Sequence, residues 1–243
     1  MKLAATAIVV VIGLASAGSA QGWGVKYANG PDPAVSRWPS WPHPTGCLGV
    51  TFDPVGVFSG STEAEKGTGG AELALRRYLD EGLYPQTPTR FWRLVSTTGS
   101  EAFFASGLLE QGLFWLAFRL ADGQWRLAGN LDECRARTVR DGSVAVRWDL
   151  VPGQGLSAAA KRVRVKLTGS EGCNGGRSLN ASADPEFRQF GRKLVLTVWV
   201  DPLPPGAYTC EKRREPPLAV KLPGRLGERQ LWDGSFYPPR REF

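Results

Sequence analysis

The stretch Arg-Val-Arg-Val-Lys-Leu-Thr, residues 162–168, alternates charged and apolar side chains along its length. Side chains of a β-strand point to opposite faces in turn, so the apolar residues are predicted to share one face and the cations the other. The apolar residues are Val163, Val165 and Leu167, and the cations are Arg162, Arg164 and Lys166. A strand with one dry face and one wet face has this pattern, which predicts an antiparallel sheet with one face in water.

Two further stretches of the second half carry strand patterns. Residues 143–150, SVAVRWDL, are predicted to share a face through Val144, Val146, Trp148 and Leu150. Residues 193–200, KLVLTVWV, are almost continuously apolar, which is typical of a strand in the middle of a sheet. Shorter strands are predicted at 207–212, 218–223 and 228–233. Several strands separated by turn residues predict a basic all-β domain over 139–243 that is β-sandwich-like.

An immunoglobulin-like arrangement is one option for this half. Tyr208 precedes Cys210 by two residues, and in immunoglobulin-like sandwiches a tyrosine at this offset hydrogen-bonds to the backbone of the preceding loop. Cys173, however, lies closer to Cys210 than the spacing usual in that fold. An immunoglobulin-like or related Greek-key sandwich is therefore an alternative and not a conclusion.

The first half combines one helix with strands. Residues 70–83 carry apolar side chains at the spacing of an amphipathic helix, with Thr68 near its start and Gly82 at its end. The apolar stripe consists of Ala71, Ala74, Leu75, Tyr78 and Leu79. A period of two follows in 89–97, 101–106 and 113–120, and the ADGQ of 121–124 is typical of a hairpin turn. We expect residues 47–138 to form one helix packed on an antiparallel sheet, and the chain to be α+β but mostly β.

The first 20 residues have the layout of a secretory signal peptide. Lys2 provides the positive start, residues 3–14 are apolar, and 15–20 offer small residues for cleavage. A membrane-spanning helix needs about 20 apolar residues, so this run is short for a permanent span. An uncleaved anchor is the alternative. We expect a secreted or extracytoplasmic protein of the cell envelope, with no transmembrane span after cleavage.

The chain contains four cysteines, Cys47, Cys134, Cys173 and Cys210, and no C-x-x-C pair of the kind that binds zinc. In an exported protein an even count indicates disulfides. Three pairings are possible, and we favour Cys47–Cys134 with Cys173–Cys210 because each bridge then stays within one half of the chain. The competing hypothesis makes Cys210 a nucleophile activated by the cations that follow it. It is disfavoured because a cysteine nucleophile usually needs a histidine, and His43 is the only one.

Residues 21–46 are rich in proline and glycine and are predicted to form an extended arm. The arm contains Trp23, Trp38 and Trp41. If these rings are exposed, their flat faces are a candidate contact for sugars or for a partner protein. The alternative, which we favour, is that they pack inward and hold the arm against the body of the protein.

Charge is distributed unevenly along the chain. Residues 21–133 hold nine basic and twelve acidic residues, whereas residues 134–243 hold 20 basic and 11 acidic residues. A basic surface attracts anionic partners. The candidate ligand-binding cations are Arg162, Arg164, Lys166, Lys212, Arg213 and Arg214. The alternative is that these side chains only keep a sheet face in water, and no specific nucleic acid is expected because no nucleic-acid-binding motif is present.

The sequence contains no recognisable catalytic motif. A single histidine leaves one way to complete a Ser-His-Asp triad, and no G-x-S-x-G elbow accompanies it. Histidine-based zinc sites are excluded by the same count. We therefore predict no catalytic residues, no metal and no cofactor. An acidic pair brought together by folding is the alternative, because two carboxyl groups suffice for hydrolysis of a glycosidic bond.

The C-terminal third carries two cysteines followed by the pattern L-G-x-R-x-L-x-D-G. In this chain the pattern consists of Leu226, Gly227, Arg229, Leu231, Asp233 and Gly234. It resembles the end of a class of uncharacterised exported bacterial proteins. The resemblance implies a bacterial origin and an envelope or extracellular setting, and it implies no activity. From the residues themselves we expect a tight turn and a final strand, with Arg229 and Asp233 paired.

Together these observations favour a secreted, disulfide-bonded binding or envelope-associated module over an enzyme. Its partner is unknown, and an anionic polymer of the envelope and another exported protein are the candidates. The alternatives are a secreted hydrolase that uses an acidic residue pair, and a purely structural protein.

Overall fold

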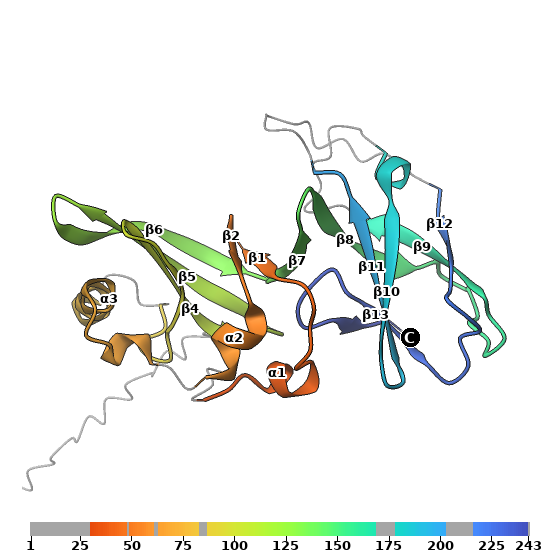
Figure 1. Ribbon diagram of the computed structural model, residues 1–243, viewed down its shortest axis with the longest axis horizontal. Coiled ribbons are helices and arrows are strands. Elements are labelled where there is room, and N and C mark those ends of the chain that lie inside the picture. The colour runs from red at the N-terminus through yellow and green to blue at the C-terminus, as the bar shows by residue number, and fades with distance from the viewer. Residues whose placement is uncertain are drawn as a thin grey trace, which may run out of the picture.

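The computed structural model describes residues 30–47, 49–60, 63–82, 87–168, 178–202 and 216–242 (Figure 1). The predicted signal peptide and Trp23 lie outside these ranges. The described chain forms a four-stranded sheet and a ten-stranded sheet that curls into a half-barrel. The predicted α+β, mostly β class is confirmed.

Among the helices in the described ranges, none has both the length and the apolar character that crossing a membrane requires.

The four-stranded sheet is covered on one face by the predicted helix, α3 (Gly70–Glu81), as Figure 1 shows. Its strands run in the order β3 (Arg93–Thr97), β4 (Glu101–Leu108), β5 (Gly112–Ala121) and β6 (Gln124–Cys134). Leu75 of α3 and Phe104 of β4 are completely buried in the core between helix and sheet. The helix ends at Gly82, whose φ of 61° is left-handed and suits glycine. Its N-cap is Gly69 and not Thr68.

The ten-stranded sheet has a continuous path of strands in the order β14-β13-β11-β8-β7-β1-β2, and three strands branch from it. Strand β10 pairs with β11, β9 pairs with β8, and β12 pairs with β9. The bounds are β1 (Thr45–Cys47), β2 (Val50–Phe52), β7 (Arg137–Arg140), β8 (Ser143–Leu150), β9 (Arg162–Thr168), β10 (Asp184–Phe190), β11 (Lys193–Val200), β12 (Leu218–Lys221), β13 (Gln230–Asp233) and β14 (Arg240–Arg241).

Strand β11 is the central strand, as its apolar sequence predicts. It pairs with β10 along one edge and with β13 and β8 along the other. Leu194, Leu196 and Val198 enter the core of the half-barrel, together with Val163 and Val165 of β9. This curled sheet is the form that the predicted sandwich-like half takes. The tyrosine that suggests an immunoglobulin-like arrangement lies outside the described residues.

One predicted member of the buried face of β8 is wrong. Val144 is 36% exposed, whereas Val146 and Trp148 are almost completely buried. Val144 lies beside the turn that joins β8 to β7, where the half-barrel core has ended, and its neighbour Ala145 is buried instead.

Two short helices begin at Asp-Pro pairs that the sequence analysis did not interpret as helix starts. These are α1 (Pro33–Arg37) and α2 (Pro54–Ser59). The Asp32 carboxylate accepts a hydrogen bond from the N–H of Ala34, and Asp53 accepts from Val55 and Gly56. An aspartate N-cap followed by proline in the first turn is a strong start signal. Two single 3₁₀ turns, Ala64–Lys66 and Asn180–Ser182, complete the helices.

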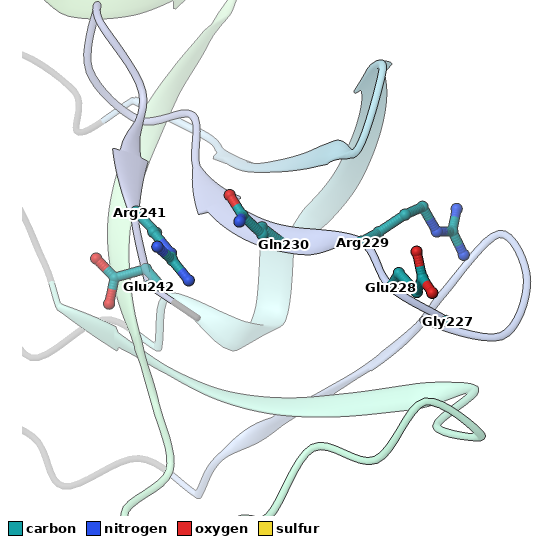
Figure 2. A pocket seen from close by; sticks show the side chains of 6 residues that line it. All are labelled: Gly227, Glu228, Arg229, Gln230, Arg241 and Glu242. Atoms are coloured by element: carbon teal, nitrogen blue, oxygen red, sulfur yellow. The ribbon is translucent and has the colours of Figure 1, made fainter.

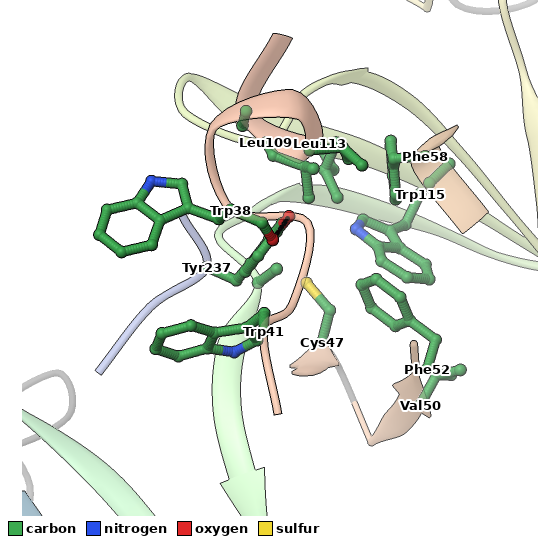
Figure 3. Close-up of a cluster of buried hydrophobic side chains, with 14 of the residues drawn as sticks. Trp38, Trp41, Cys47, Val50, Phe52, Phe58, Leu109, Leu113, Trp115 and Tyr237 are labelled. Carbon is green, nitrogen blue, oxygen red and sulfur yellow. Dashed lines mark hydrogen bonds between the residues drawn. The ribbon is translucent and has the colours of Figure 1, made fainter. Parts of the chain in front are cut away.

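The two halves predicted from the sequence share a sheet. Strands β1 and β2, which precede the four-stranded sheet in the chain, pair through β1 with β7. The boundary predicted near residue 139 therefore falls inside a strand. A core between the sheets contains Trp38 and Trp41 of the arm, Trp115 of β5, Val195 of β11 and Tyr237 (Figure 3).

The C-terminal motif serves the fold. Leu226 and Leu231 are buried in the half-barrel core, and Gly227 has a left-handed φ of 62°. A Cβ at Gly234 would collide with the side chains of Thr197 and Val195, so only glycine fits there. Strand β14 follows β13, so β13 is not the final strand.

The predicted disulfide between Cys47 and Cys134 is confirmed. It joins the end of β1 to the end of β6, with Cα atoms 6.2 Å apart and a sequence separation of 87. The bridge therefore ties the two sheets together. The second predicted bridge, Cys173–Cys210, lies outside the described residues.

Replacing both cysteines of this bridge, as Cys47→Ala with Cys134→Ala, should lower the free energy of unfolding by about 4–5 kcal/mol. The chain-entropy model gives this value for a loop of this length, because the open chain has more conformations to lose. Urea denaturation of the oxidised protein and of the double variant measures the difference. Denaturation curves with the same midpoint and the same slope for the two proteins would contradict the prediction.

Candidate anion-binding face

The outward face of β8, β9 and β12 gathers positive charge. Val163 and Val165 of β9 are completely buried, so the alternate residues must point to the other side. The antiparallel register places Lys221 of β12 directly opposite Arg162, and Asp149 of β8 directly opposite Lys166. We call this surface the basic face. Its cations are Arg147, Arg162, Arg164, Lys166, Lys221 and Arg240.

Asp149 is the one acidic residue among the strand residues that point outward here. Its Oδ1 lies 3.2 Å from Nη2 of Arg147 and 3.9 Å from Nη2 of Arg240. Its Oδ2 accepts a hydrogen bond of 2.9 Å from the hydroxyl of Thr168. The carboxylate is therefore already shared by three groups, and it neutralises only one end of the basic face.

The other four cations make no ion pair with any residue that the structure describes. They are Arg162, Arg164, Lys166 and Lys221, and all four are exposed. Lys221 and Arg162 face each other across neighbouring strands, an arrangement of like charges that destabilises a sheet. An anion bound between them would relieve that repulsion.

Three of the six cations predicted from the sequence lie together on the basic face: Arg162, Arg164 and Lys166. The other three, Lys212, Arg213 and Arg214, lie outside the described residues. Arg147, Lys221 and Arg240 were not among the predicted cations. Arg147 and Lys221 each stand between apolar residues in strand sequences, so the period of two could have identified them.

A shallow groove of about 520 Å³ lies beside β13 and β14, and Figure 2 shows the residues that line it. It is lined by residues 227–230 and by Arg241 and Glu242. The Glu242 carboxylate accepts a hydrogen bond of 3.0 Å from Nε of Arg240. Through Arg240 the groove and the basic face are therefore contiguous.

Arg229 of the groove is held by the fold. Its Nε donates to the carbonyl of Leu226 at 3.0 Å, Nη1 donates to Gln189, and Nη2 to the carbonyl of Arg225. The predicted pairing of Arg229 with Asp233 is wrong. The reason is that Asp233 points into the turn that follows its own strand.

The Asp233 carboxylate is buried and hydrogen-bonded inside that turn. The N–H of Ser235 donates to Oδ1 at 2.9 Å and its hydroxyl to Oδ2 at 2.8 Å. Burial raises the pKa of Asp233 to about 7, and burial also raises the pKa of the neighbouring Glu242. The charge of Glu242 also raises the pKa of Asp233, but only 1% of Asp233 is exposed. Its carboxyl group therefore serves the turn.

Substituting Asp233→Asn should flatten the pH dependence of stability between pH 4 and 7. The folded-state pKa is raised, so the stability that protonated Asp233 contributes is complete below about pH 4 and is lost as pH rises to about 7. A shift of about three units corresponds to roughly 4 kcal/mol. Urea denaturation of both proteins from pH 4 to 8 measures the difference, and parallel curves would rule the prediction out.

The arm tryptophans in the described range are buried (Figure 3). Trp38 is 2% exposed and Trp41 is 7% exposed. The ring centroid of Trp38 lies 5.2 Å from that of Trp232 and 4.2 Å from Nζ of Lys193. Both rings therefore pack inward, as we favoured. The alternative prediction, that Trp38 and Trp41 are exposed for contact with a sugar or a partner protein, is wrong. The rings hold the arm against β11 and β13 because they cover apolar surface there.

His43 lies where the arm crosses β10 and β11. Its ring centroid is 5.1 Å from that of Trp199, and Nε2 is 3.3 Å from Oε1 of Glu186. Burial lowers the pKa of His43, although Glu186 opposes that shift. Burial alone would raise the pKa of Glu186, but hydrogen bonds from Arg188 and Trp199 hold it below its usual value. No three His, Cys, Asp or Glu residues gather as metal ligands anywhere in the described ranges.

Protonation of His43 should cost stability as pH falls below about 6.5, in opposition to the contribution of Asp233, and His43→Gln should remove that cost. Because the folded-state pKa is lowered, the unfolded chain binds a proton first, and stability that is complete above 6.5 declines on acidification. His43 is the only histidine, so melting temperatures from pH 5 to 8 isolate its contribution. A variant curve identical in shape to the wild-type curve would refute this.

No known family model, curated protein or solved structure matches this chain. The resemblance of the C-terminal motif to exported bacterial proteins stays a prediction. The functional argument therefore depends on the geometry of the basic face.

Proposed function

We propose that this protein is an extracytoplasmic binding module that holds an anionic polymer on the basic face. The observation that carries the proposal is the row formed by Arg162, Arg164 and Lys166 with Lys221 beside it. All four side chains are exposed, and none is paired with a described acid. Such a row attracts anions and releases them as salt screens the interaction.

The backbone beneath the row is rigid, which favours binding over simple solvation. The inner face of β9 is completely buried at Val163 and Val165, and β9 pairs with a strand on either side. The Cα positions of the cations are therefore fixed before any ligand arrives. A preorganised row loses less conformational entropy on binding than a flexible basic tail does.

The basic face is also open, a shape suited to a polymer. Its cations are spread over neighbouring strands instead of converging on one buried point, so a long anion can contact several of them at once. The extracytoplasmic setting is supported by the predicted signal peptide. The disulfide between Cys47 and Cys134 is compatible with it, because such bonds persist in oxidising compartments.

The triple variant Arg162→Gln, Arg164→Gln and Lys166→Gln should bind soluble heparin about 100-fold more weakly than the wild type. Each cation near an anionic surface contributes about 1 kcal/mol, so three contribute about 3 kcal/mol. Isothermal titration at low salt measures the affinity.

The matched control replaces three exposed arginines elsewhere, Arg77, Arg126 and Arg135, with glutamine. It changes the net charge by the same amount and should bind nearly as the wild type does. Equal losses in the two triple variants would show that net charge alone drives binding. Absence of wild-type binding at low salt would remove the proposal altogether.

A further inference from the structure

We infer that the polymer on the basic face is a linear phosphodiester whose phosphates are joined by three-carbon bridges and which carries no bases. This inference rests on the proposed function and specifies its ligand. Poly(glycerol phosphate) is the simplest polymer of this chemistry. It would lie along β9, with successive phosphates beside Arg162, Arg164 and Lys166.

The spacing of the cations is the first argument. Outward residues of a strand are two residues apart, which is about 7 Å along the chain. Two residues of extended backbone comprise six covalent bonds. Three-carbon bridges also place six bonds between neighbouring phosphorus atoms, from phosphorus through oxygen, three carbons and oxygen. An extended polymer of this kind therefore repeats its charge at nearly the interval at which β9 repeats its cations.

The ends of the row set the length of the binding track. At one end Lys221 lies directly opposite Arg162, so two cations can share one phosphate and lose their mutual repulsion. At the other end Asp149 lies opposite Lys166 and is already bonded to Arg147 and Thr168. Beyond Lys166 the next outward residue of β9 is Thr168, which is uncharged, and Arg147 opposite Thr168 is already paired with Asp149. The geometry thus gives a track for three phosphates.

The chemistry of the face argues against a nucleic acid. Single-stranded DNA has the same six bonds between phosphates, but its binding proteins also provide aromatic rings on which bases stack. On β9 and β12 the outward residues that carry no charge are Thr168 and Ala219, and neither is aromatic. The bases of a nucleic acid would find no ring on which to stack here, so a polymer without bases is the better occupant.

Fluorescence anisotropy with labelled oligomers tests the inference on the full protein. The probes are glycerol phosphate oligomers of one, three and six phosphates, inorganic polyphosphate of six phosphates, and oligo(dT) of six phosphates. We expect a large gain from one phosphate to three and only a small gain from three to six. The glycerol phosphate hexamer should bind more tightly than polyphosphate, whose phosphorus atoms are two bonds apart, and at least as tightly as oligo(dT).

Salt dependence and variants complete the test. The slope of log affinity against log salt is negative, and each of Arg162→Gln, Arg164→Gln and Lys166→Gln should reduce its magnitude by about 0.7–0.9, because one ion contact is lost. The control Arg126→Gln should leave the slope unchanged. Circular dichroism and melting curves verify that each variant is folded.

The outcomes separate the inference from the proposed function. Tighter binding of polyphosphate than of the glycerol phosphate hexamer, or affinity that rises evenly with length, would overturn the spacing argument while heparin binding still supports the basic face. Tighter binding of oligo(dT) would overturn the choice of a polymer without bases. Failure of every probe, heparin included, would overturn the proposed function as well.

Discussion

The burial of β11 on both faces is the constraint on which the rest of the large sheet depends. Leu194, Leu196 and Val198 fill the half-barrel core, while Val195 on the other face packs in the core with the arm tryptophans. A strand buried on both sides needs partners along both edges, and β11 has β10 on one edge and β8 and β13 on the other. The half-barrel core therefore buries one face of β11, and the arm buries the other.

The basic face follows from the same constraint. Strand β9 closes the half-barrel core with Val163 and Val165, so its alternate residues must lie in water. Any polar residue would satisfy that requirement. Cations occupy three of the four outward positions of β9, with a fourth cation directly opposite in β12, and they place like charges across a strand pair. The proposed anionic partner would relieve that repulsion.

The arm and the disulfide join the large sheet to the remainder of the molecule. Trp38 and Trp41 cover the outer side of the large sheet, and the bridge from Cys47 to Cys134 joins that sheet to the four-stranded one. His43, at the crossing of the arm over β10 and β11, contacts Trp199 and Glu186. Protonation of His43 therefore acts on the contact that holds the arm in place.

The even number of cysteines indicated disulfides, and the structure decided that Cys47 pairs with Cys134. The sequence by itself determined the features that depend on near neighbours: the helix α3, the alternation of β9 and the buried character of β11. Local periodicity suffices for these because each is a property of one segment. Only the tertiary structure decided that β1 and β2 join the large sheet, that Lys221 faces Arg162, and that Asp233 turns away from Arg229. These depend on which strands pair and in which register, and a pairing between distant segments leaves no periodic signal in either one.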